Sequence, residues 1–224
     1  MWDWVLEARR RWWRRRRVAP PLQRFLAHAL PDPRGSCRDA EYVAVDLETT
    51  GLRPRWDAPL SVGWVLVRAG AIELATARYA VLRAKREVAQ SATVHGLTDD
   101  AVADGEDAAA VLAELLAVLA GRVLVAHHAA IELRFLDRLC REHFGGPLLV
   151  RVVDTLALAA RSAERHGAVD ENALRLHAVR ARYGLPRYAA HSALSDALAT
   201  AELLLALTAE REGSGGLPLR RLLR

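Results

Sequence analysis

The sequence predicts one α/β domain in which helices flank a mixed sheet of three antiparallel strands followed by parallel strands. Three apolar segments at 42–47, 60–68 and 71–83 follow one another with only short turns between them, a spacing typical of antiparallel strands. From residue 107 onward, helical and strand-like patterns alternate, which indicates parallel strands joined by helices. The chain of 224 residues is 52% hydrophobic, which suffices for the core of such a domain.

The elements after residue 107 are bounded by residues that end helices. Gly121 closes an alanine- and leucine-rich helix, and Gly184 and Pro186 separate the last helix from the one before it. Between the helices, the short apolar segments RVLVAH and RVVD are typical of buried strands. The expected helices are 107–121, 131–142, 155–166, 172–182 and 191–210, and the expected strands are 122–127 and 151–154.

Charge and composition divide the chain into three parts. Residues 1–40 form a basic, Trp/Arg-rich N-terminal arm and linker with ten Arg against four acids, a net charge of +6. The main domain covers residues 41–210, and residues 211–224 form a short basic C-terminal tail. Since the whole chain carries +5, everything after residue 40 is nearly neutral at −1. The overall basic charge is therefore no argument that the domain itself binds nucleic acid.

The N-terminal arm begins MWDWVLEARRRWWRRRRVAPP and holds four of the six Trp. Its pattern indicates a short helix that ends before Pro20 and Pro21. A basic, aromatic segment suits a nucleic-acid backbone or an anionic membrane surface. The same pattern suits Trp side chains that pack on the domain or on a partner equally well, and the sequence leaves both alternatives open.

Cysteine content and hydropathy indicate a soluble protein of a reducing compartment. The chain has only two cysteines, Cys37 and Cys140, and no N-terminal segment has the long apolar core of a secretory signal or a membrane span. We therefore expect a cytoplasmic location.

Two carboxylates interrupt the first expected strand. Asp46 and Glu48 are two residues apart, so on an extended strand their side chains point to the same face. Val43, Val45 and Leu47 occupy the opposite face. Neighbouring like charges on a core strand repel each other and resist burial, so the pair needs a compensating partner such as a cation.

Other polar residues could complete a site with this pair, although each also has a plain structural explanation. Asp196 suits a helix start, Glu132 suits a solvated helix face, and His191 suits a structural position before a helix. If the four acids converge, their hard oxygen ligands favour Mg²⁺ or Mn²⁺. Two such ions about 4 Å apart, with a His that takes a proton from water, are suited to phosphodiester hydrolysis.

Three segments resemble the motifs of the DEDDh exonuclease family. They are VAVDLETTGL at 43–52, LVAHHAAIELRFLD at 124–137 and HSALSDALATAELL at 191–204. This superfamily includes the proofreading epsilon subunit of bacterial DNA polymerase III, ribonuclease T and oligoribonuclease. The resemblance covers roughly residues 41–209, and it implies a ribonuclease-H-like fold and an exonuclease domain over 41–210.

The resemblance also implies the roles of individual residues. Asp46, Glu48, Glu132 and Asp196 would bind two Mg²⁺ or Mn²⁺ ions, and His191 would be the catalytic general base. Glu132 stands where the family usually has Asp, and His128 stands where it usually has Asn. Because Glu is still an oxygen ligand, we expect retained activity with altered metal preference. The implied substrate-binding residues are Thr49, Gln90, His95 and His128.

The implied activity is metal-dependent 3′–5′ hydrolysis of terminal phosphodiesters. Single-stranded or frayed DNA would be the substrate, and nucleoside 5′-monophosphates would be the products. The alternatives are an exoribonuclease of the same family and a catalytically weakened module that binds nucleic-acid ends or a polymerase. The expected partners are therefore a nucleic-acid 3′ end, with DNA favoured, and a DNA polymerase subunit, with membrane contact of the arm as an unsupported option.

Overall fold

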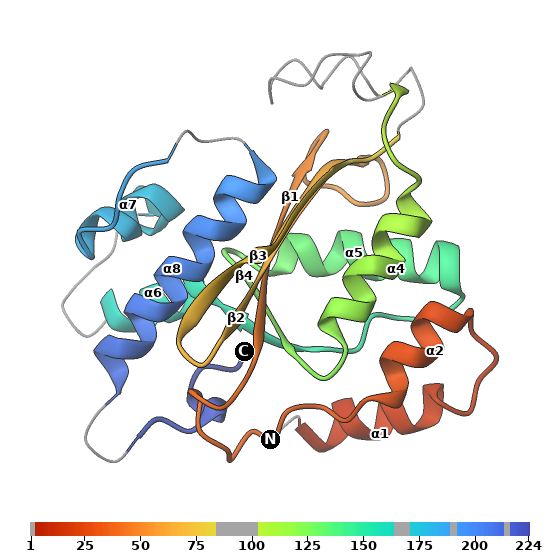
Figure 1. Ribbon diagram of the computed structural model, residues 1–224, viewed down its shortest axis with the longest axis horizontal. Helices are drawn as coiled ribbons and strands as arrows, with labels where there is room; N and C mark the ends of the chain where they lie inside the picture. The colour runs from red at the N-terminus through yellow and green to blue at the C-terminus, as the bar shows by residue number, and fades with distance from the viewer. Residues whose placement is uncertain (1–2, 84–102, 164–170, 189–191, 213–215) are drawn as a thin grey trace.

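The computed structural model describes residues 3–83, 103–163, 171–188, 192–212 and 216–224. Its centre is a five-stranded mixed sheet in the order β3-β2-β1-β4-β5 (Figure 1). The strands are β1 (Tyr42–Thr49), β2 (Pro59–Arg68), β3 (Ala71–Val81), β4 (Val123–Ala126) and β5 (Arg151–Asp154). The first three pair antiparallel, and β4 and β5 continue the sheet in parallel with β1. The mixed sheet expected from the sequence is therefore confirmed.

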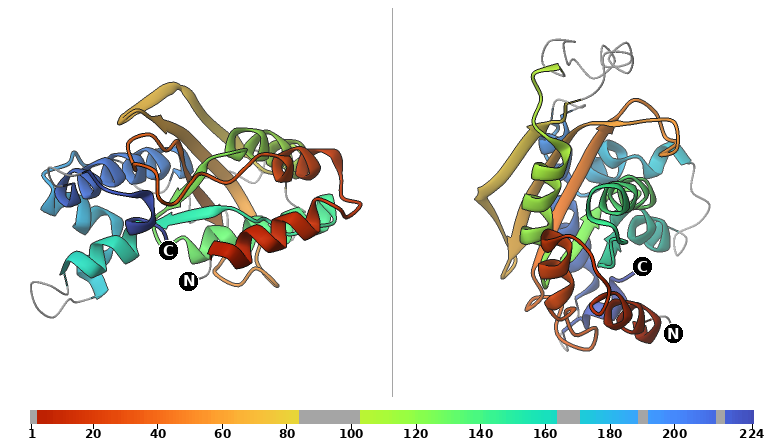
Figure 2. Two further views of the ribbon diagram at one scale, coloured as in Figure 1. Left: turned by 90° about the horizontal axis from the view of Figure 1, so that it is seen from below. Right: turned by 90° about the vertical axis from the view of Figure 1, so that its right-hand side faces the viewer.

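Helices cover both faces of the sheet (Figures 1 and 2). Alternate side chains of β1 explain the two layers, because Val43 and Val45 belong to one core cluster while Tyr42 and Ala44 belong to the other. The first cluster lies under α2 (Pro20–Ala27), α4 (Ala108–Leu119) and α5 (Ala130–Phe144). The second lies under α6 (Thr155–Ala163), α7 (Leu176–Arg182) and α8 (Ala193–Arg211).

The helix expected over 172–182 is interrupted. A 3₁₀ turn, η3 (Glu171–Leu174), precedes α7, and Arg175 between them is extended at φ −62° and ψ 146°. His127 explains the break, because its Nε2 lies 2.9 Å from the Leu174 carbonyl oxygen. That carbonyl is used in a tertiary hydrogen bond, so the chain ends one turn and starts another.

The start of α8 lies directly on the sheet at Gly63 of β2. A Cβ at Gly63 would lie 2.3 Å from the Leu194 backbone nitrogen, so only glycine allows this approach. Small residues on α8, including the fully buried Ala197 and Ala201, permit the same close contact. Leu194 is only partly buried because the sheet side of the helix carries these alanines.

The N-terminal segment packs on the domain, in contrast to the expected arm and linker. After α1 (Asp3–Trp13), Pro20 and Pro21 begin α2, where they need no backbone donor. Phe25 and Leu26 of α2 are buried in the core, and Trp13 of α1 packs against the same core cluster. The packing alternative is thus confirmed for Trp13, and residues 3–40 belong to the folded unit.

The C-terminal segment also packs on the domain and meets the linker region. The Cys37 amide donates to the Leu217 carbonyl at 2.8 Å, and Leu219 of η4 (Leu219–Arg221) is buried with Leu222. Leu223 forms an isolated antiparallel bridge with Val153 of the edge strand β5. Across the described helices, none combines the length and the apolar character that crossing a membrane requires.

Candidate active site

The candidate site lies where the carboxyl ends of β1, β4 and β5 meet. These three strands are parallel, so their C-terminal residues share one edge of the sheet. Asp46 and Glu48 lie near the end of β1, His127 and His128 follow β4, and Asp154 ends β5. The fold therefore collects titratable side chains from distant parts of the sequence at this edge.

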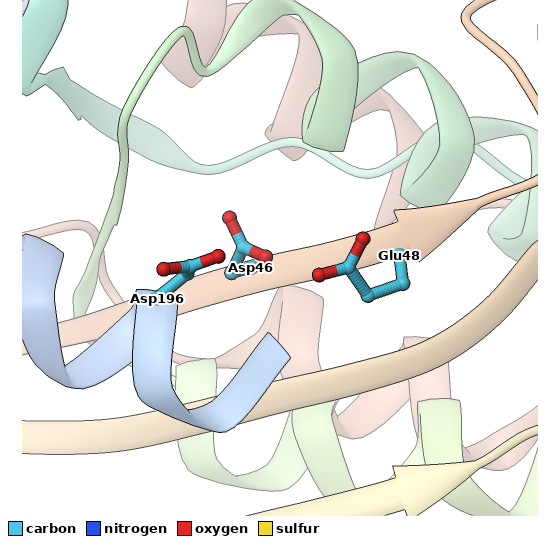
Figure 3. A group of neighbouring side chains, drawn as sticks. All are labelled: Asp46, Glu48 and Asp196. Atoms are coloured by element: carbon cyan, nitrogen blue, oxygen red, sulfur yellow. The ribbon is translucent and has the colours of Figure 1, made fainter. Parts of the chain in front are cut away.

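Three carboxylates form a cluster that could hold a metal ion (Figure 3). One ligand oxygen each from Asp46, Glu48 and Asp196 lies within 4.8 Å of the others. Asp46 and Glu48 come from one face of β1 as predicted, and Asp196 comes from the first turns of α8. Burial and the three neighbouring carboxylates, that of Glu132 foremost, raise the pKa of Asp46 well above its ordinary value. Without a cation the cluster is electrostatically strained.

Glu132 reaches the same region from the first turn of α5. It is 4% exposed, and its Oε2 has no hydrogen-bond partner among the described residues. Burial, reinforced by the charge of Asp154, raises the pKa of Glu132 to about 8. Glu132 is not part of the group of three carboxylates that lie within 4.8 Å of one another, but its charge acts on Asp46. Its buried oxygen without a partner among the described residues is the kind of hard donor that a divalent cation takes. The residues present therefore fit the expected metal.

Of the predicted general base and substrate-binding residues, the structure describes only Thr49 and His128. Gln90, His95 and His191 lie outside the described residues. Thr49 is buried at the end of β1, and its hydroxyl donates to the Gly51 carbonyl at 2.7 Å, so the hydroxyl shapes the turn after the strand. The side chain of His128, directly after β4, is exposed, and its backbone adopts a left-handed φ of 71°. A substrate contact of either residue stays a prediction.

Asp154 is a site residue that the sequence analysis missed. Its Oδ1 accepts hydrogen bonds from the backbone amides of His128 at 3.1 Å, Leu156 at 3.1 Å and Ala157 at 3.3 Å. Asp154 thereby caps α6 and fixes the strained turn that leads into the helix of Glu132. Its signal in the sequence is an Asp between a buried strand and a helix, which is the position of an N-cap.

Gly63 is a second residue that the analysis missed. Its backbone lies directly opposite Asp46 in the β1–β2 pair, and its missing side chain admits the start of α8. Asp196 follows within the first turns of that helix, so Gly63 fixes how closely the two carboxylates approach each other. A single glycine in an apolar strand pattern is the sequence signal for such a close approach.

The chain belongs to the Exonuclease family, whose sequence pattern it matches over residues 43–204. This match covers all three acidic motifs and both elements that carry the clustered carboxylates. Together with the fold, it confirms the resemblance to 3′–5′ exonucleases of the DEDDh type.

PolC-type DNA polymerase III sequences are similar to this chain. The polymerase of Thermotoga maritima is 30% identical over 168 residues, which is 75% of this chain. The polymerase of Staphylococcus aureus is 28% identical over 178 residues, which is 80% of this chain. In both cases the chain spans only 12% of the length of the relative.

Among solved structures, the fold is similar to that of E. coli exonuclease I. Its complex with a dT13 oligonucleotide gives a TM-score of 0.64 at 17% identity and covers 75% of this chain and 41% of that chain. A zinc-bound complex of the same enzyme with single-stranded DNA gives a TM-score of 0.65 at 18% identity, with 77% and 41% coverage. At this level of identity the likeness demonstrates a shared ribonuclease-H-like fold.

Proposed function

We propose that the protein is a metal-dependent 3′–5′ exonuclease that hydrolyses terminal phosphodiesters of single-stranded or frayed DNA and releases nucleoside 5′-monophosphates. The observation that carries this proposal is the convergence of Asp46, Glu48 and Asp196 within 4.8 Å, beside a buried Glu132 whose Oε2 has no partner among the described residues. Such a concentration of neighbouring carboxylates is costly, and it is useful when cations are bound.

Each acid has an assigned part in the proposed site. Asp46, Glu48 and Asp196 would hold one Mg²⁺ or Mn²⁺ ion, and Asp46 and Glu132 would hold a second. When bound, such ions stabilise the negative charge that develops on phosphate oxygens during hydrolysis. The longer side chain of Glu132, in place of the usual Asp, supports a metal preference different from that of other family members.

His191 is the proposed general base. It precedes Asp196 by five residues, so it is attached to the start of the helix that carries a metal ligand. A His with an ordinary pKa near 6.5 takes a proton from the attacking water efficiently near neutral pH. Thr49, Gln90, His95 and His128 are assigned to the terminal nucleotide.

The comparisons support DNA over RNA as the substrate. The similar PolC-type proteins are DNA polymerases, and the similar exonuclease I structures hold single-stranded DNA. An association with a DNA polymerase is proposed on the same basis, since the relatives combine a region like this chain with a much longer protein.

Matched DNA and RNA oligonucleotides with a label on the 3′-terminal nucleotide test this proposal. We expect labelled mononucleotide from DNA in Mg²⁺ or Mn²⁺, less from RNA, and none in chelator. Asp196→Asn is the control for contaminating nucleases. Absence of mononucleotide in either metal at enzyme excess would overturn the proposal and leave a module that binds nucleic-acid ends, whereas faster RNA cleavage would move the substrate to RNA.

The role of His191 is tested separately with His191→Ala. General-base catalysis contributes about 10²- to 10⁴-fold, so the rate should fall by that factor. Because His191 is not an assigned ligand, the rise in melting temperature on metal addition should persist. A wild-type rate would remove His191 from the mechanism.

A further inference from the structure

The solvent-facing side of α1 combines exposed aromatic and basic side chains. Trp4 and Trp12 are 70% and 50% exposed, which is unusual for tryptophan. Arg11 lies on the same side of the helical wheel as Trp4, and Arg15 and Arg16, in the turn that follows α1, are also exposed. We call these five residues the outer face of α1.

Buried polar contacts hold α1 in place. The guanidinium of Arg10 donates to the backbone carbonyls of Phe25 and His28 at 2.8 Å each and to that of Leu149. Arg151, which is buried, forms an ion pair with Glu7 at 3.1 Å. The outer face is therefore presented by a fixed helix, and binding to it requires little ordering of the backbone.

The inner side of α1 is already occupied. Leu6 and Trp13 pack against the core cluster, so the apolar stripe of the helix is covered by the domain. A helix that lies in a membrane interface needs an apolar face separate from its basic face. On the outer face, Trp and Arg are interleaved instead, which is the pattern of a surface that stacks bases and neutralises phosphates.

The positive charge of this region has no acidic partner among the side chains that the structure describes. Among the described residues, the exposed arginines at 9, 11 and 14–17 form no ion pair with an acid. Arg16 lies over the Trp12 ring at 3.9 Å from its centroid, a cation–π contact that keeps the indole and the guanidinium together. A ligand that complements these arginines and Trp rings is a polyanion with exposed aromatic bases.

We propose that the outer face of α1 is a second binding surface for single-stranded nucleic acid, with phosphates on the arginines and bases stacked on Trp4 and Trp12. Figure 1 shows α1 at the opposite end of the molecule from the start of α8 and the end of β1, where the carboxylates lie. Only a strand long enough to span the molecule reaches both places. That the strand bound at α1 is also the substrate of the enzyme rests on the proposed exonuclease function.

The test compares binding of long and short single strands in chelator, where no cleavage occurs. The variant is Arg11→Gln/Arg15→Gln, and the control is Arg161→Gln/Arg182→Gln, which removes the same charge from exposed positions on α6 and α7. For a strand of about 30 nucleotides, we expect the variant to bind about tenfold more weakly and the slope of log K against log salt to fall by about 1.4. For about six nucleotides, affinity should not change.

The outcomes are separable from those of the proposed function. Wild-type affinity of the Arg11/Arg15 variant for the long strand, or an equal loss in the control, would overturn the second surface even if cleavage is normal. Trp12→Ala provides an independent variant, with about fivefold or greater loss expected from stacking. Sedimentation with vesicles containing phosphatidylglycerol that depends on Arg11 and Arg15, with unchanged affinity for DNA, would assign the face to a membrane instead.

Discussion

Arg10 and Glu132 are both titratable residues in the protein interior, with 5% and 4% of their surface exposed, but their surroundings differ completely. Arg10 donates to three backbone carbonyls, two of them at the end of α2, and also lies over the Phe25 ring at 4.7 Å. Glu132 keeps one carboxylate oxygen without a partner among the described residues.

This difference indicates that Arg10 serves the stability of the fold, whereas Glu132 serves the chemistry of the site. Carbonyl dipoles satisfy the Arg10 guanidinium, although burial and the nearby Arg14 lower its pKa to about 10. Burial and the neighbouring acid Asp154 favour the protonated form of Glu132, and a bound cation would favour its carboxylate instead. Asp46 shares this situation at the centre of the cluster.

The largest effect should come from Asp46→Asn. We expect loss of about 10³-fold or more in the rate of mononucleotide release, because Asp46 is the ligand assigned to both ions. The same change should raise the free energy of unfolding of the metal-free protein by about 1–2 kcal/mol, since it removes like-charge repulsion. Exonuclease assays and urea unfolding in chelator measure the two effects.

Asp39→Asn is the control, because Asp39 is exposed and away from the cluster. It should change neither quantity. A metal-free Asp46→Asn protein that is less stable than wild type would contradict the view that the cluster is strained.

Arg10→Met should affect stability and leave chemistry unchanged. Removing the guanidinium leaves three backbone carbonyls without their donor, so we expect a loss of about 3–5 kcal/mol in the free energy of unfolding. The rate of the folded variant should equal that of wild type. Arg9→Met, at an exposed neighbouring position, should shift stability by less than about 0.5 kcal/mol. A reduced rate of mononucleotide release by folded Arg10→Met would contradict the view that Arg10 affects stability alone.

A bound metal ion should stabilise the buried Glu132 carboxylate, as the backbone carbonyls stabilise the buried Arg10 guanidinium. At a metal concentration of about 100 times Kd, wild type should gain about 2.7 kcal/mol in stability, and Glu132→Gln should gain clearly less. Thermal unfolding with Mg²⁺ and Mn²⁺ measures the gain. Glu114→Gln, which changes an exposed acid on α4, should match wild type. Equal gains in all three proteins would exclude Glu132 as a ligand.

His127 is a third titratable group in the interior, and its neutral ring has a hydrogen-bond partner at each nitrogen. Its Nδ1 lies 2.9 Å from the Thr155 hydroxyl and its Nε2 lies 2.9 Å from the Leu174 carbonyl. Burial lowers the pKa of His127 to about 4, with Asp154 opposing and His128 adding to the shift.

The sign of its pH dependence follows from proton binding. Below about pH 6.5 the unfolded chain protonates this ring while the folded protein does not, so stability is retained above pH 6.5 and falls progressively toward pH 4. We expect this group to contribute about 3 kcal/mol of that loss. Urea unfolding across this range should show a smaller loss for His127→Gln than for wild type. An equal loss of stability in the two proteins between pH 6.5 and pH 4 would rule out His127 as the source of that loss.

Much of the fold and the placement of two of the three clustered carboxylates were predictable because they depend on local periodicity. The alternation of Val43, Val45 and Leu47 with Asp46 and Glu48 fixes which side chains share a face. The break at Arg175 was not predictable, since it depends on a hydrogen bond between Leu174 and His127, which is far away in the sequence. Asp154 resembles an ordinary N-cap until the strand ends are brought together.

The sequence alone determined which strands run antiparallel and which run parallel, the pairing of Asp46 with Glu48 and the motifs of the exonuclease family. These properties follow from spacing along the chain. Only the tertiary structure decided that Glu132 is buried without a partner for one oxygen, that Gly63 admits α8 beside Asp46, and that Arg10 anchors α1. Each of these depends on the packing of segments that are distant in sequence, which short-range patterns do not specify.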